Sequence, residues 1–171
     1  MDNALLKHVP ALEAALNEMV SAHEALLNLL ERKRDALRRN DTDALVQVGA
    51  LENEKIRVIA ELEKRRAELV AHLTLQLEPN ATEPMRLAEL AQRLPEPARG
   101  KLLVLREQLR QRMQQVRDSA SVVRRASESL LKHMHGLVQS VVTMANGTTT
   151  YGDRGQTSTA NAAVRTINVT A

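Results

Sequence analysis

The sequence has no cysteine, no tryptophan and no phenylalanine, and it contains a single tyrosine among 171 residues. The absence of cysteine excludes disulfide bonds and thiolate metal sites, and it fits a reducing compartment such as the cytoplasm. The lack of aromatic rings restricts any core to aliphatic side chains, which suit helices packed on helices. It also leaves almost no side chain for stacking on nucleic-acid bases.

Long apolar runs are missing as well. No run approaches the roughly 18 residues that a membrane-spanning helix needs, and no basic start precedes an apolar stretch as in a signal peptide. With 43% hydrophobic residues, the chain is long enough for one domain with a core. We therefore expect a soluble, cytoplasmic protein that does not insert into a membrane.

Leucine, valine and methionine recur at alternating spacings of four and three residues along three stretches. These stretches run from Leu5 to Leu37, from Leu45 to Leu77, and from about Pro97 to Asn146-Gly147. Such spacing places apolar side chains on one helix face and is typical of helices that pack at a shallow angle. The pattern predicts an all-α fold, namely an elongated antiparallel bundle of three long coiled-coil-like helices plus one short helix.

Polar residues predict the turn between the first two helices. The short side chains of Asn40-Asp41-Thr42-Asp43 bond nearby backbone amides and compete with the helix interior. Either Asp41 or Thr42 should cap the second helix. Gly49 costs about 1 kcal/mol relative to alanine and is expected to weaken the first two turns of that helix.

Prolines predict where helices end and begin in the middle of the chain. Pro79 ends the second helix because its ring excludes the helical conformation for the residue before it. Thr82 is then expected to cap a short helix that starts at about Pro84. The buried face of that helix is predicted to consist of Leu87, Leu90 and Leu94.

The end of the chain differs in composition from the rest. Residues 147–171 are rich in Thr, Ser, Gly, Asn and Ala, and such a segment buries too little apolar surface to offset the entropy of ordering it. We expect a helical-bundle domain over residues 1–146 and a flexible polar tail over residues 147–171.

The third helix is predicted to be the longest, so that one of its ends lacks intramolecular cover. Its last turns carry an apolar stripe two residues wide, which is a candidate docking surface. Packing on the short helix, or on a second copy in a homodimer, remains an alternative. In the tail, two apolar residues lie three apart, a spacing that chance also produces. The candidate partner-binding residues are Leu137, Val138, Val141, Val142, Met144, Val164 and Ile167.

No pattern indicates an enzyme, a metal site or a cofactor. His133 and His135 would point about 200° apart on a helix and could not chelate one ion. His23-Glu24 begins like a zinc-protease helix, but the second histidine is missing, so His23 is expected to fix the helix register. We predict no catalytic, metal-ligating or cofactor-binding residue and no small-molecule substrate.

Charge is distributed unevenly along the chain. Residues 41–78 carry eight acids and five bases, whereas residues 97–145 carry three acids and nine bases. Opposite signs favour side-by-side packing of these two segments. A nucleic-acid-binding protein is the least favoured alternative, because most basic clusters have acidic neighbours. These clusters are Arg32-Lys33-Arg34, Lys64-Arg65-Arg66 and Arg124-Arg125.

The order of these features resembles the FlgN family of flagellar type III export chaperones. The resemblance extends over nearly the whole chain, and its motifs include Glu24-Ala25-Leu26-Leu27, Leu37, the stretch Asp41 to Leu45, and the tail segment from Thr150 to Gln156. It implies a cytoplasmic chaperone that binds hook-filament junction (hook-associated) subunits, prevents their premature assembly and delivers them to the export gate. It further implies that Tyr151 contacts the gate. A generic coiled-coil adaptor is the alternative function.

Overall fold

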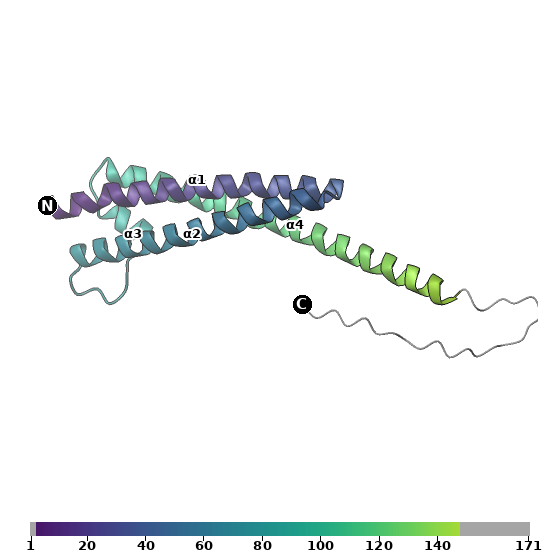
Figure 1. Cartoon of the computed structure of the whole chain (residues 1–171). Coiled ribbons are helices and arrows are strands. Elements are labelled where there is room, and N and C mark those ends of the chain that lie inside the picture. Colours follow the sequence, from purple (N-terminus) through teal and green to yellow (C-terminus); the bar gives the residue numbers. More distant parts are fainter. Residues whose placement is uncertain (1–2, 148–171) are drawn as a thin grey trace, which may run out of the picture. The chain divides into compact units, whose positions relative to one another are not determined.

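The computed structural model describes residues 3–147 and, among these, the side chains of residues 8–144. This range forms four helices and no strand, which confirms the predicted all-α class with three long helices and one short one. Among the described residues no helix is both long and apolar enough to cross a membrane. The helices are α1 (Asn3–Arg39), α2 (Thr42–Leu77), α3 (Leu87–Gln92) and α4 (Ala98–Gly147), labelled in Figure 1.

The chain divides into two compact units, with the boundary after Leu130. In the first unit α1 and α2 form an antiparallel hairpin, and α4 up to Leu130 runs beside them (Figure 1). An aliphatic cluster joins all four helices. Its fully buried members include Leu12 and Leu16 of α1, Leu73 of α2, Leu90 of α3 and Leu102 of α4.

The cross-helix ion pairs of α4 do not follow the net charges of the segments. The second and third long helices have opposite net charge, yet the cross-helix ion pairs of α4 that the structure describes go to α1. Exposed pairs of this kind contribute little, so apolar packing decides which helices are adjacent. The ion pairs between long helices are Lys33–Glu52 (2.5 Å), Arg65–Glu18 (3.6 Å), Lys101–Glu13 (3.8 Å) and Arg112–Glu24 (3.5 Å).

The start of the α4 seam differs from the heptad reading. A strict heptad spacing between Leu102 and Leu109 would put Arg106 in the seam, but Arg106 is exposed and Leu105 is buried instead. Leu102, Leu105 and Leu109 are spaced by three and then four residues, which gives an unbroken aliphatic row. A spacing of four and then three residues would instead bury the Arg106 guanidinium. The charged side chain is thereby kept in water.

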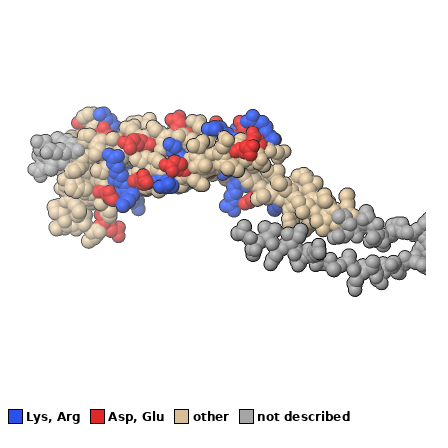
Figure 2. All heavy atoms as spheres, viewed as in Figure 1, with Lys and Arg blue, Asp and Glu red and all other residues tan. Residues whose placement is uncertain are grey.

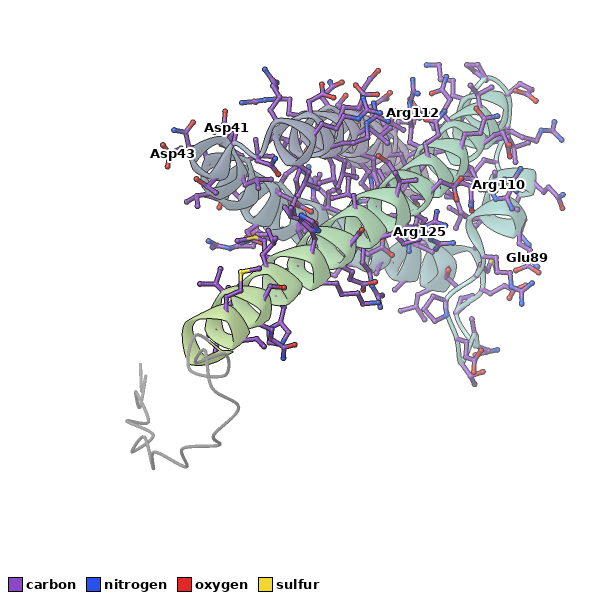
Figure 3. The ribbon with its side chains drawn as sticks, turned by 90° about the vertical axis from the view of Figure 1, so that its right-hand side faces the viewer. Asp41, Asp43, Glu89, Arg110, Arg112 and Arg125 are labelled. Atoms are coloured by element: carbon purple, nitrogen blue, oxygen red, sulfur yellow. The ribbon has the colours of Figure 1, made fainter. Side chains whose placement is uncertain are left out.

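The turn between α1 and α2 forms where it was predicted. Asn40 adopts a left-handed conformation with φ of 53°, and Asp41 is the N-cap of α2 (Figure 3). The Asp41 Oδ1 atom accepts a hydrogen bond of 2.9 Å from the Ala44 amide. Helix α2 continues through Gly49 without interruption, because contacts along the rest of its length outweigh one unfavourable residue.

Replacing Asp41 with alanine should lower the free energy of unfolding by about 1 kcal/mol, since the Ala44 amide loses its partner. Urea unfolding followed by far-UV circular dichroism measures the change. Thr42→Ala is the matched control and should leave stability nearly unchanged, because Thr42 already lies inside the helix. A larger effect at Thr42 than at Asp41 would show that Thr42, and not Asp41, caps α2.

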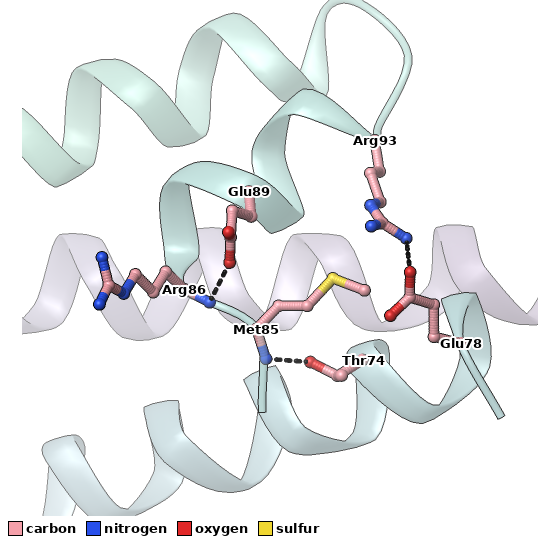
Figure 4. Close-up of polar contacts among 6 residues, drawn as sticks. All are labelled: Thr74, Glu78, Met85, Arg86, Glu89 and Arg93. Carbon is pink, nitrogen blue, oxygen red and sulfur yellow. Dashed lines mark hydrogen bonds and ion pairs between the residues drawn. The ribbon is translucent and has the colours of Figure 1, made fainter. Parts of the chain in front are cut away.

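The segment before α3 does not follow the prediction. Thr82 is not the cap and residues 82–86 are not helical; α3 starts at Leu87, after Arg86. The buried Thr74 explains the later start, because its Oγ1 accepts a 3.0 Å hydrogen bond from the Met85 amide and holds this non-helical stretch against α2 (Figure 4). The same hydroxyl donates to the Val70 carbonyl, so the buried Thr74 Oγ1 both donates and accepts a hydrogen bond.

Two further contacts hold α3 in place. The Arg86 amide donates a 3.2 Å hydrogen bond to Glu89 in the first turn, and Arg93 pairs with Glu78 at the end of α2 (Figure 4). The predicted apolar residues of this region do contribute to the core, since Leu90 and Leu94 are buried and Leu87 packs against them. The short helix thus closes one end of the first unit.

Candidate partner-binding face

The second half of α4 exposes large aliphatic side chains. Five predicted partner-binding residues lie here, and each is at least half exposed, from 52% for Val142 to 73% for Met144. Tyr151, Val164 and Ile167, the remaining candidates, lie outside the described residues. We call the exposed set the α4 stripe; it consists of Leu131, Met134, Leu137, Val138, Val141, Val142 and Met144.

Two members of the stripe are absent from the predicted set. Leu131 is 66% exposed and Met134 is 53% exposed. The heptad spacing contains the signal for Met134, since it continues the seam from Val123 through Ser127 and Leu130. Leu131 lies beside that seam, as Val138 and Val142 do two and three turns later. A search of the seam and of the positions beside it from Leu130 onward would have found both.

The opposite side of this segment is polar and already satisfied. Ser140 donates a 2.9 Å hydrogen bond to the Gly136 carbonyl, and Thr143 donates one of 2.8 Å to the Gln139 carbonyl. Lys132 is the only formally charged residue between 131 and 144. Figure 2 accordingly shows mostly uncharged surface on the last described turns of α4. Apolar surface, and not polar surface, is what this segment leaves unpaired.

The histidines do not form a metal site in the described part of the chain. His23 is buried at its seam position, and its Nδ1 atom lies 2.7 Å from the Met19 carbonyl, to which it can donate. Both His133 and His135 are exposed. Across the described residues, no group of three histidine or acidic side chains is placed to hold an ion. His23 is therefore a packed helix residue with a local hydrogen bond.

The basic clusters are largely engaged by carboxylates. Arg66 hydrogen-bonds Glu63, which raises the pKa of the Arg66 guanidinium above its ordinary value. Lys64 lies 4.0 Å from Glu68, and Arg124 donates a 2.9 Å hydrogen bond to Glu128. Figure 2 shows blue and red atoms interspersed over the first unit. This mixed surface is not the single-sign stripe that a nucleic-acid backbone attracts.

The described part of the chain is all-α, and an aliphatic helix face that is left uncovered, as the α4 stripe is, suits a protein that binds another chain's helices. The family model described as FlgN protein matches residues 1–159, and the chain belongs to the FlgN family. It is thus a flagellar export chaperone, a class that binds flagellar subunits and carries out no enzymatic reaction of its own. No curated protein and no solved structure matches the chain.

Proposed function

We propose that this chaperone acts in the cytoplasm on hook-filament junction subunits, keeps them from assembling prematurely and delivers them to the export gate. The exposure of the α4 stripe supports this proposal most directly, because seven large aliphatic residues within four turns are open to another chain. Contiguous apolar surface of this kind is typical of a binding site.

In the proposed complex, each chain buries exposed apolar surface of the other. An unassembled subunit whose terminal helices pair in the filament exposes its own apolar seams, which drive aggregation. Packing such a helix on the α4 stripe removes apolar surface of both chains from water, at about 25 cal/mol per Å² buried. The subunit then stays soluble and its assembly surface is blocked until the chaperone leaves.

Isothermal titration of the full chain against purified junction subunits tests the proposal. We expect saturable binding and a negative heat-capacity change, the marker of apolar burial. The subunits should also remain soluble longer when the chaperone is present. A chain that binds unrelated coiled coils as tightly as junction subunits would instead be a generic adaptor, which is the alternative function.

Replacing Tyr151 with alanine should weaken docking to the export gate while subunit binding stays largely intact. The family resemblance assigns gate contact to this residue, the only tyrosine in the chain. Pull-down of the chaperone–subunit complex by the gate component measures docking, and titration against the free subunit measures binding. An equal loss of both would refute the separation of the two roles.

A further inference from the structure

The width of the α4 stripe carries information about what covers it. At 100° per residue, the seven side chains are spread over an arc of about 160° around the helix axis. Met144 lies at one edge together with Leu137, and Val142 lies at the other edge together with Leu131. A seam that meets one partner helix uses only heptad positions a and d, which are about 60° apart. The stripe is therefore too wide for one helix.

The first unit shows what covers such an arc elsewhere on α4. Residues from Met113 to Leu130 that are buried or half buried span about 140° of the same face. Two helices cover them, since Val123 packs against Leu26 and Leu30 of α1 with Ile59 of α2 beside them. An arc of this width on α4 is thus the footprint of a helix pair.

We propose that the occupant of the α4 stripe is a pair of packed aliphatic helices from one flagellar subunit, with one helix along each edge. This inference rests on the proposed function and adds the number of helices that the chaperone holds at once. A second copy of this chain fits less well, because one stripe paired with another presents a single helix and leaves an edge of each uncovered. The heptad spacing that α4 uses against α1 and α2 continues into the stripe, so the same mode of packing extends to the partner.

Two double variants test the pair, one for each edge: Leu137→Ala with Met144→Ala, and Leu131→Ala with Val142→Ala. Alanine keeps helix propensity, so the helix itself is preserved. We expect each variant to weaken binding of a purified junction subunit by at least about tenfold, as removal of anchoring apolar side chains does. Val46→Ala with Val104→Ala, which removes exposed side chains on other faces, is the matched control and should bind as the wild type does.

Combining the two edges sharpens the test. Because the edges contact different helices, the fold-changes of the two double variants should multiply in the quadruple variant. Wild-type affinity in either edge variant would overturn the pair and leave a single partner helix. Light scattering is measured alongside: a wild-type dimer that either edge variant dissociates would make a second copy the occupant and overturn the inference. Wild-type chain that binds no junction subunit would remove the proposed function itself.

Discussion

Exchange of Val141 for aspartate should weaken binding of a junction subunit by about a hundredfold or more. Val141 lies near the middle of the α4 stripe, so a partner helix that covers the stripe must bury this position. Burial of an unpaired carboxylate against aliphatic side chains is strongly unfavourable, and loss of the valine removes a central contact. Isothermal titration at fixed ionic strength measures the difference.

The fold should tolerate this exchange, because Val141 is 66% exposed in the free chain and no core contact is lost. Far-UV circular dichroism and thermal unfolding should therefore match the wild type. Val46→Asp on α2 is the matched control, since Val46 is a similarly exposed valine, at 75%, on a different helix. If the Val46 variant lost as much affinity as the Val141 variant, the loss would result from the added negative charge in general and not from disruption of the α4 stripe.

Leu102→Ala should destabilise the protein by about 2 to 5 kcal/mol. Its side chain is fully buried where α4 enters the aliphatic cluster, so truncation leaves a cavity that the neighbouring helices fill only in part. Chemical unfolding measures the loss as a lower midpoint at an unchanged slope.

Leu103→Ala tests the same chemistry one residue away. Leu103 is 36% exposed, so its truncation should cost less than about 1 kcal/mol. Similar losses at both positions would mean that α4 is rotated about its axis relative to the structure. The pair therefore checks the helix register that places Leu105, and not Arg106, in the seam.

The candidate face was predictable in part. Seam spacing led to Leu137, Val141 and Met144, and the neighbouring valines added width, all of which the structure shows as exposed. Leu131 and Met134 were missed because the apolar seam of α4 is uniform, and no local sequence feature marks where its side chains change from buried to exposed.

The errors in the fold have a common origin. Thr82 has the right chemistry for a cap, yet the distant Thr74 bonds the Met85 amide and delays the helix to Leu87. Arg106 occupies a regular heptad position, yet the row on α4 shifts so that Leu105 packs instead. In both places a contact between distant residues overrides a local preference.

Periodicity and helix breakers alone determined the number, order and approximate lengths of the helices and narrowed the cap of the second helix to Asp41 or Thr42, because each depends on residues within one or two turns. Only the tertiary structure decided which seam residues are covered and that the ion pairs of α4 go to α1. Burial depends on neighbours from distant parts of the chain, and one aliphatic seam looks the same in sequence whether it is buried, as at Leu102, or exposed, as at Val141.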